Sequence, residues 1–410
     1  MKIKTKYREI REDFSLNKNP LFNAIAKLEP KAVANTIPLT WHKAIDFSVW
    51  DDKGNKWIDL TSGIFVANAG HSNPKIKKAI KDQLDSDMLF AYNYPTKIKH
   101  KFLSKLLSIS PSYFDRVILL NSGSEAMDIV YKLIKFYGKK NNKKYIITFK
   151  GNYHGRGLSN DLFSGSVEKA KWSGVSDDSV CFLDFPYNEK DVFDSKKLPP
   201  AEEIAGFVIE TFQGWGEWFY PQKYIKDLYQ FAKKAGALVS FDELQAGFYR
   251  LGPVYGYMTY GKEIKPDIIG LGKGISSSMP MGAVLSRKDI VDIDEKADLH
   301  GTHSGSALVC AAALANLDFL SSPTQIKLRE KTMKVFEEEM RSLKSCPFVT
   351  HINVRGMMGA IIFEKSENAL KVGKECIYNG VLPVCTNKNS IKIAPPLTIS
   401  VEALKEAFQV

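Results

Sequence analysis

Two residues of this 410-residue chain have the type and the setting for one particular chemistry, Lys273 and Asp242. Lys273 follows the short apolar segment 268–271 and has a glycine on either side. A lysine amine held in a dry pocket can form a Schiff base with an aldehyde cofactor. Asp242 ends an earlier apolar run, residues 237–241, and its carboxylate could keep a pyridine nitrogen protonated. Because pyridoxal 5′-phosphate (PLP) chemistry needs this pair of groups, the two residues predict a PLP site.

A phosphate-binding segment is predicted at residues 121–126, whose sequence NSGSEA joins a buried strand to a helix. Backbone N–H groups at a helix N-terminus bind phosphate, glycine allows a close approach, and serine hydroxyls add donors. Gly123 and Ser124 are the candidates for this contact. An ordinary helix start with Ser124 as its N-cap would give the same residue pattern.

Three further motifs carry weaker signals. The aromatic ring of the YHG motif at 153–155 could stack on a flat cofactor ring, or it could pack a turn. The glycines of segment 270–274 lack the spacing of a dinucleotide-binding turn. His300 and His303 lie close together in the chain, but the sequence suggests no third ligand, so we expect no metal site.

Short apolar runs alternate with helical patterns through the middle of the chain, which predicts a mainly parallel sheet covered by helices on both faces. Predicted strands are 117–120, 145–149, 180–183, 205–209, 237–241 and 268–269, with helices at 124–137 and 224–235 among those between them. After about residue 315 the pattern changes to a long charged helix at 325–343, strands at 351–353 and 360–363, and helices at 368–378 and 400–408.

This change of pattern predicts three parts of the chain. They are an N-terminal segment (1–55), a large PLP-binding domain (56–315) and a smaller α+β domain (316–410). We expect the N-terminal segment to pack with the small domain or with a partner subunit.

Composition and charge restrict the class of protein. The net charge of +11 comes from scattered lysines without an RNA-binding signature or zinc finger, so we expect a lysine-rich surface and no nucleic-acid partner. Apolar runs stay shorter than the roughly 20 residues that span a membrane, and the sequence indicates no secretory signal. The five cysteines are odd in number and lack metal-ligand spacing. These observations predict a cytoplasmic protein with reduced thiols and no membrane association.

The motifs are more specific in combination, because they follow one order: SGSEA, YHG, Glu210 after a strand, DELQAGF, GKG, GTHSG and APPL. This order resembles the class III aminotransferases, of the ornithine and 4-aminobutyrate transaminase type, over roughly residues 40 to 400. The resemblance implies an α/β chain of PLP-dependent transferase fold type I (aspartate-aminotransferase-like), with a large domain around a mainly parallel sheet and a smaller α+β domain. It also implies a homodimer, since the family forms its active sites at the interface between two subunits.

Catalytic and phosphate-binding roles follow from the resemblance. Lys273 would form the Schiff base and carry protons between the substrate Cα and the cofactor. Asp242 would pair with the pyridinium nitrogen, so that the ring acts as an electron sink. Gly123 and Ser124 would bind the phosphate together with Thr302 from the other subunit.

The resemblance also places three residues around the cofactor ring. Tyr153 would stack on one face of the ring, and Leu244 would cover the opposite face. Gln245 would approach the 3′ oxygen.

One departure from the family concerns the substrate. Many members have an arginine shortly before the PPL run, where it binds the α-carboxylate of glutamate or 2-oxoglutarate, whereas this chain has Lys392. A lysine is a point charge without arginine's planar two-bond fork, which weakens glutamate as the donor. Arg355, Arg156 or Arg250 could hold the carboxylate instead, and Lys392 could point to solvent from a surface strand. Further candidates for substrate contacts are Glu210, Phe65, Tyr92, Trp215 and Trp218.

The sequence therefore predicts a PLP-dependent aminotransferase with a ping-pong mechanism. An amino acid, possibly glutamate, would donate its amino group, and an aldehyde, keto acid or keto-sugar-like compound would accept it. One alternative is an aminomutase of the glutamate-1-semialdehyde type, which needs no separate amino donor. Another is a noncatalytic regulator with a PLP fold, although the intact Lys273 and Asp242 favour an enzyme.

Overall fold

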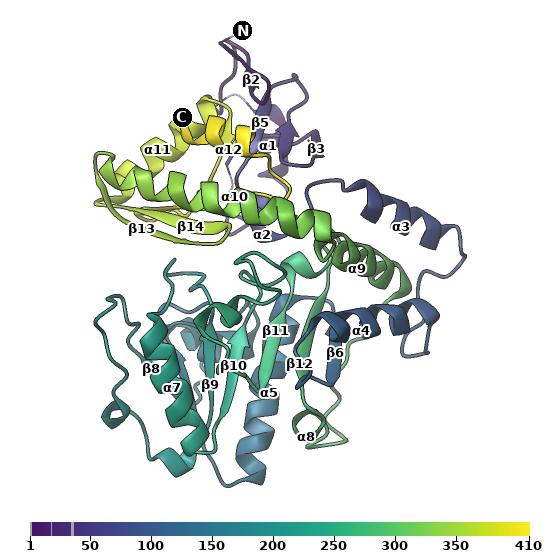
Figure 1. The fold of residues 1–410 in the computed structure, drawn as a ribbon, viewed down its shortest axis with the longest axis vertical. Coiled ribbons are helices and arrows are strands. Elements are labelled where there is room, and N and C mark those ends of the chain that lie inside the picture. Colours follow the sequence, from purple (N-terminus) through teal and green to yellow (C-terminus); the bar gives the residue numbers. More distant parts are fainter. Residues whose placement is uncertain (1, 18, 34–36) are drawn as a thin grey trace. The chain divides into compact units, whose positions relative to one another are not determined.

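The computed structural model describes residues 2–17, 19–33 and 37–410, and it divides into two compact units (Figure 1). The large unit is Pro74–Ile326, and the small unit combines Met1–Asn73 with Lys327–Val410. The sequence pattern had placed the changes at residues 55 and 315. The second boundary lies at residue 326 and not at 315. Helix α9 (Ala307–Leu320) packs against α3 (Pro74–Leu84) and α4 (Lys97–Ile109), so it belongs to the large unit.

A seven-stranded sheet forms the centre of the large unit, in the order β6-β12-β11-β10-β9-β7-β8. Neighbouring strands are parallel except at β12, which runs antiparallel to both β6 and β11. The mainly parallel sheet is therefore confirmed, and β12 is a strand that the sequence pattern did not reveal. The strands are β6 (Arg116–Leu120), β7 (Tyr145–Phe149), β8 (Val180–Leu183), β9 (Ile204–Glu210), β10 (Leu238–Asp242), β11 (Ile268–Leu271) and β12 (Gly282–Ser286).

Helix α5 (Gly123–Lys140) packs against β9, β11 and β12 through an apolar face that includes Met127, Val130 and Ile134. Each such side chain, when fully buried, contributes roughly 1.5–3 kcal/mol to the free energy of folding. Its N-cap is Ser122, whose Oγ accepts the Glu125 N–H at 3.2 Å. The alternative in which Ser124 is the N-cap is wrong, because the helix begins at Gly123 and Ser122 caps it.

Shorter elements complete the large unit. Its other α-helices are α6 (Leu158–Phe163), α7 (Gln222–Lys234), which packs against β10, and α8 (Lys288–Val291). Its 3-10 helices are η1 (Val167–Ser173), η2 (Ser195–Lys197), η3 (Ala201–Glu203), η4 (Gly256–Tyr260) and η5 (Lys273–Ile275).

Two sheets form the small unit. One has the order β1-β2-β5-β4-β3, with β15 also paired to β5, and the other has the antiparallel order β13-β14-β17-β16. The elements of the first part are β1 (Ile3–Lys4), β2 (Glu9–Ile10), α1 (Pro20–Ile25), β3 (Lys43–Ile45), β4 (Ser48–Trp50), β5 (Lys56–Asp59) and α2 (Ser62–Phe65). Those of the second part are η6 (Leu343–Ser345), β13 (Val349–Arg355), β14 (Met358–Phe363), α11 (Ser366–Tyr378), β15 (Val381–Leu382), β16 (Val384–Cys385), β17 (Ser390–Ile393) and α12 (Val401–Phe408). Helix α10 (Pro323–Ser342) begins in the large unit and continues into the small one.

The N-terminal segment packs with the C-terminal part inside the small unit, one of the two arrangements expected for it. Trp57 Nε1 donates to the carbonyl of Ile377 at 2.8 Å, and Arg8 Nε lies 2.8 Å from Glu406 Oε1. Trp57 is fully buried in a cluster with residues such as Ile10 and Leu382. Residues from both ends of the chain thus share one core.

A left-handed turn follows β5. Ser62, Gly63, Ile64 and Phe65 have φ values of 49°, 59°, 63° and 68°. This backbone costs roughly 1–2 kcal/mol for each residue with a Cβ atom. The turn is held by a hydrogen bond of 2.6 Å from Ser62 Oγ to the carbonyl of Ala394.

Within the described part of the chain, no single helix has the length and apolar character to cross a membrane. Helices Ala307–Leu320 and Pro323–Ser345, which meet at 65°, pass that test when they are taken as a bent pair.

Candidate active site

Three strand ends bring the predicted site residues into one row of the large sheet. In the parallel register, Asp242 at the end of β10 lies beside Glu210 of β9 on one side and Gly270 of β11 on the other. Lys273 follows Gly270 by three residues. Ligands of open α/β sheets bind at the carboxyl ends of parallel strands, so this row is where the fold would place a cofactor.

The Asp242 carboxylate is almost completely buried, and two nitrogen atoms lie within hydrogen-bond distance of its oxygens. His154 Nδ1 lies 2.9 Å from Oδ2, and the backbone N–H of Leu244 donates to Oδ1 at 3.0 Å. A buried carboxylate is tolerated when such donors compensate for lost water. Asp242 is thereby a fixed hydrogen-bond acceptor at the strand end.

Lys273 has a left-handed backbone, with φ of 45°, at the start of η5. The next two residues are held by Asn316 of α9, whose Nδ2 donates to the carbonyls of Gly274 and Ile275, both at 2.9 Å. A left-handed residue other than glycine costs of order 1–3 kcal/mol and persists when its surroundings over-determine it. The position of Lys273 is therefore set by the fold and not by local preference.

Glycines let three loops meet near Asp242. A Cβ atom on Gly123 would overlap the side chain of Leu244, and a Cβ atom on Gly272 would lie 3.3 Å from Leu244 Cγ and 3.4 Å from Gly123 Cα. Gly123, Leu244 and Gly272 are thus in contact. They are the phosphate-binding candidate, the residue expected on the cofactor face and the glycine before Lys273. Neither glycine position has room for a Cβ atom, because the side chain of Leu244 and the backbone of Gly123 already occupy that space.

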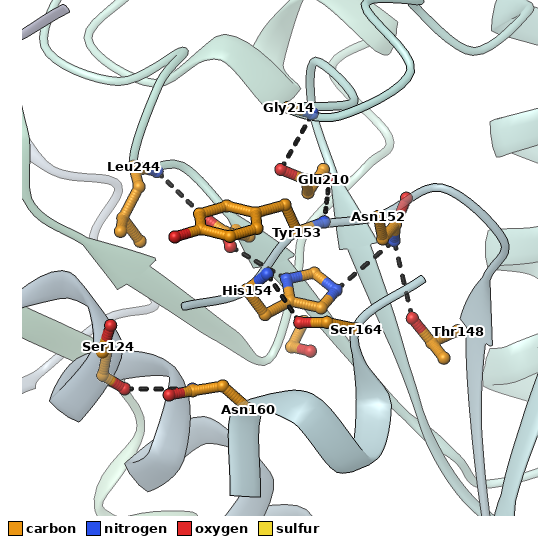
Figure 2. Close-up of polar contacts among 12 residues, drawn as sticks. Ser124, Thr148, Asn152, Tyr153, His154, Asn160, Ser164, Glu210, Gly214 and Leu244 are labelled. Atoms are coloured by element: carbon orange, nitrogen blue, oxygen red, sulfur yellow. Dashed lines mark hydrogen bonds and ion pairs between the residues drawn. The ribbon is translucent and has the colours of Figure 1, made fainter. Parts of the chain in front are cut away.

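Tyr153 and Trp215 form a stacked pair above the strand ends, with ring centroids 6.0 Å apart and planes inclined by 22°. The Glu210 carboxylate, 2% exposed, accepts the Tyr153 N–H at 2.8 Å and the Gly214 N–H at 3.0 Å (Figure 2). Glu210 therefore connects the two loops that carry these aromatic rings. In the described contacts it positions backbone, a role that sequence reasoning did not foresee.

Gln245 gives a second indication of a polar ligand. Its Oε1 is buried and has no hydrogen-bond partner among the residues that the structure describes. Its Nε2 lies against Gly214, where a Cβ atom would overlap it. Buried polar atoms are nearly always paired, so an unpaired one beside a row of site residues fits an external partner.

The phosphate candidates lie next to the loop of Thr302. Ser124 Oγ, in the first turn of α5, accepts the Arg156 N–H at 3.2 Å. A Cβ atom on Gly301 would lie 2.9 Å from Asn121 Nδ2, so the Thr302 loop contacts the segment before the helix. Thr302 itself is exposed.

Two substrate candidates, Lys392 and Arg355, belong to the small unit. Lys392 is 9% exposed and lies in β17 opposite Ala360 and Val384. Its Nζ is 6.0 Å from the centroid of the Phe65 ring. The interpretation of Lys392 as a solvent-facing surface lysine is therefore wrong. Arg355 ends β13 and is half-buried.

Glu243 is a buried carboxylate that sequence reasoning passed over. It turns away from its neighbour Asp242 and accepts N–H groups of Gly256 at 2.6 Å and Tyr257 at 2.7 Å, together with the hydroxyl of Thr211. Burial raises the pKa of Glu243 to about 7, although these donors oppose the shift. Within the DELQ segment, one acidic residue thus serves the site and the next one holds the loop at 254–257.

No group of three or more His, Cys, Asp and Glu side chains that could hold a metal ion occurs in residues 2–17, 19–33 and 37–410. His300 instead lies 2.9 Å from Asp298 and 3.3 Å from the hydroxyl of Tyr92. The His303 ring packs on Phe90, with centroids 4.9 Å apart.

Comparison with known proteins agrees with the geometry. The family model for class III aminotransferases matches residues 30–410. Acetylornithine aminotransferase from Clostridium acetobutylicum is 30% identical over 379 residues, which cover 90% of this chain and 94% of the relative. Its counterpart from Wolinella succinogenes is 31% identical over 369 residues, covering 88% and 91%. Ornithine aminotransferase from Toxoplasma gondii has the same fold, with a TM-score of 0.83 at 23% identity over 95% of this chain and 92% of that one.

Fold and site together define a PLP-dependent transferase of fold type I. The chain belongs to the class III aminotransferases, PLP-dependent enzymes that transfer an amino group from an amino acid to a carbonyl acceptor.

Proposed function

We propose that the amino donor carries a carboxylate that Arg156 binds, and that glutamate is the first donor to test. Arg156 Nε donates to the Tyr153 hydroxyl at 2.9 Å, which holds the guanidinium beside the stacked Tyr153 and Trp215 rings. Arg156 is exposed, and no residue in the described part of the chain accepts a hydrogen bond from its Nη atoms. A guanidinium fork of this kind binds a carboxylate through two parallel hydrogen bonds.

The chain's own residues divide the catalytic work in this proposal. When bound, PLP supplies the electron sink that weakens the Cα–H bond of an amino acid. Lys273 Nζ would take the proton from the substrate Cα and deliver it to the cofactor, before the amino group is released from the substrate carbon. Asp242 would keep the proton on the ring nitrogen, while the first-turn N–H groups of α5, at Gly123 and Ser124, would hold the phosphate.

A half-reaction experiment tests the donor. The purified enzyme with PLP is titrated with glutamate and with 4-aminobutyrate, which lacks the α-carboxylate, while the loss of the cofactor's visible absorption band is followed. Arg156→Gln should raise the apparent dissociation constant for glutamate about ten-fold or more, because a charge-assisted hydrogen bond contributes roughly 1.5–3 kcal/mol. The apparent dissociation constant of Arg156→Lys should lie between those of wild type and Arg156→Gln, since lysine keeps the charge and lacks the fork. Equal affinities in all three proteins would show that another residue binds the carboxylate.

The same titration separates the two alternatives. An aminomutase of the glutamate-1-semialdehyde type would convert one substrate into its isomer without a separate amino donor. A noncatalytic regulator would bind PLP and show no half-reaction with any amine. Full transfer of the amino group from donor to added keto acid contradicts both.

We further propose a homodimer in which Thr302 of each subunit completes the other subunit's phosphate site. Support comes from an exposed apolar segment at 84–94, in which Leu89, Phe90, Tyr92 and Tyr94 are each 45% exposed or more. Phe90 and Tyr92 contact His303 and His300, so this segment lies beside the Thr302 loop. Apolar patches of this kind mark protein–protein contacts. Analytical ultracentrifugation gives the oligomeric state directly.

A cytoplasmic location, without nucleic-acid or membrane partners, is also proposed. All five cysteines are free, which fits a reducing compartment. Cell fractionation with an antibody to the chain tests the location. Recovery of the protein with membranes or with nucleic acid would contradict it.

A further inference from the structure

We propose that Asn152 is a positioning residue that fixes the tautomer of His154, so that His154 donates its ring proton to Asp242. The role that this gives to Asp242 rests on the function proposed above, whereas the tautomer itself does not depend on it. Figure 2 shows the contact between His154 and Asn152, and the other ring nitrogen of His154 lies within hydrogen-bond distance of Asp242.

His154 is fully buried and has no freedom to reorient. Its ring stacks on Phe163, with centroids 4.9 Å apart and planes inclined by 20°, and its backbone N–H donates to Ser164 Oγ at 2.9 Å. Nδ1 lies 2.9 Å from Asp242 Oδ2, and Nε2 lies 3.4 Å from Asn152 Nδ2. Each ring nitrogen therefore faces one defined neighbour, and the proton position depends on which way Asn152 points.

The orientation of Asn152 follows from a backbone carbonyl, which can accept and cannot donate. The carbonyl of Lys150 lies 2.7 Å from the side-chain amide nitrogen of Gln213, so that end of Gln213 must be its NH2 group. The same NH2 group lies 3.3 Å from Asn152 Oδ1. The Tyr220 hydroxyl also donates to that oxygen, at 3.4 Å.

With Oδ1 committed to two donors, the Asn152 NH2 group must face His154 Nε2. A neutral imidazole carries its proton on one nitrogen, so Nε2 presents a lone pair and the proton resides on Nδ1. The consequence is an N–H bond directed at the Asp242 carboxylate. Gln213, Asn152 and Tyr220 are all buried, so bulk water cannot exchange for these partners.

A neutral His154 has a consequence for the charge at the strand ends. Asp242 receives N–H donors from His154 and Leu244 and keeps its full negative charge for a cationic partner. An imidazolium at the same place would compensate that charge and weaken the attraction between Asp242 and a protonated ring nitrogen. Asn152 thus acts on the reaction through two intervening side chains.

Nitrogen-15 solid-state NMR of the full-length enzyme with PLP, labelled at the histidine rings, reads the tautomer directly. The chain has seven histidines, and the signals of His154 are those that are missing in His154→Gln. We expect a protonated Nδ1 and an unprotonated Nε2 for His154. A wild-type ring with its proton on Nε2, or with protons on both nitrogens, would overturn the proposal.

Asn152→Asp supplies the decisive variant, because it changes an amide into a carboxylate of the same shape. His154 would then face a carboxylate at each nitrogen, and both nitrogens should become protonated. Asn73→Asp is the matched control, since Asn73 is also buried and its Nδ2 donates to the carbonyl of Ala69. This control should leave the His154 signals unchanged. An unchanged His154 spectrum in Asn152→Asp would refute the control of the tautomer by Asn152.

A second pair of variants avoids a new charge. Tyr220→Phe alone should preserve the tautomer, because Gln213 still donates to Asn152. Tyr220→Phe combined with Gln213→Met removes both donors and frees the amide to rotate, so the double variant should show a shifted or mixed tautomer. A double variant identical to wild type would show that something else orients Asn152.

Kinetics of the loaded enzyme connect the tautomer to the reaction. Asn152→Asp should lower kcat about 10–100-fold, the range found when outer-shell hydrogen-bond partners of metal ligands are mutated, with little change in KM for the amino donor. A changed tautomer with unchanged kcat would overturn the effect on Asp242 and leave the NMR result and the aminotransferase activity intact.

Discussion

The large and small units both contain candidate functional residues in buried positions, but they hold them in different ways. In the large unit, Glu210, Asp242 and Gly270 form one row across three parallel strands, and Lys273 follows directly. In the small unit, Lys392 lies inside the antiparallel strand β17, between β14 and β16.

This difference explains why the two regions were not equally predictable. Parallel strands all end at the same edge, so residues that follow consecutive apolar runs meet even when they are far apart in the chain. In an antiparallel sheet, the neighbours of a residue depend on pairing register and on bulges, such as the shift between Val349 and His351 in β13. The predictions below test whether the two regions also differ in their contribution to catalysis.

The largest effect is expected at Lys273 of the large unit. Lys273→Ala should lower the rate of amino transfer by about three orders of magnitude or more, since it removes the group that transfers the proton. PLP should still bind through its phosphate. Borohydride reduction and peptide mass mapping of wild type should place the pyridoxyl group on Lys273. An adduct on a different lysine would contradict the assignment.

Asp242→Asn should reduce turnover by about 10²–10⁴-fold and leave the fold intact. The amide keeps the shape of the carboxylate and loses the charge that holds a proton on the cofactor ring. Rapid-mixing measurement of the donor half-reaction, with circular dichroism as a check on folding, gives the result. Near-normal turnover would mean that the row of strand ends does not supply the electron sink.

Thr302→Ala should weaken the phosphate site by the loss of one hydrogen bond, about 1–3 kcal/mol in PLP affinity. Mixing Lys273→Ala with Thr302→Ala subunits should restore activity, because each mixed dimer has one site with both residues intact. Each variant alone, taken through the same mixing procedure, is the control. Full activity in a preparation shown to be monomeric would exclude a shared site.

Lys392→Arg in the small unit should lower the apparent KM for glutamate or 2-oxoglutarate about ten-fold if this residue faces the substrate, because the fork adds a charge-assisted hydrogen bond. Lys392→Met keeps the length of the buried side chain without its charge and is the matched control. Three proteins with the same kinetics would leave carboxylate binding to Arg156 or Arg355.

The smallest effect is expected at the left-handed turn of the small unit. Ile64 is exposed and has φ of 63°, so Ile64→Gly should relieve strain and stabilise the protein by about 1 kcal/mol. Ile45 is an exposed isoleucine in the ordinary strand β3, and Ile45→Gly should destabilise the protein by roughly 0.5–1 kcal/mol. Thermal unfolding of both variants measures the difference. A loss of stability in Ile64→Gly would show that its side chain, although exposed, contributes more than the strain costs.

Several features followed from the sequence alone because they depend on local chemistry. The apolar runs gave five strands within a residue or so of their ends and β11 in part, and the order of motifs indicated the class III family. Strand β12 was not predicted, because it runs antiparallel to both neighbours and the alternation of strands with helices indicates only parallel strands.

Tertiary structure alone decided how these residues are supported. The sequence pointed to Asp242 and to the YHG motif, but 88 residues separate Asp242 from His154, and nothing local indicates their hydrogen bond. The left-handed backbone at Lys273 is likewise sustained by Asn316 from a distant helix. Sequence determines which groups can do the chemistry, since that depends on side-chain type. Which buried groups face one another depends on how distant elements pack, and so the proton on His154 and the burial of Lys392 became visible in the folded chain.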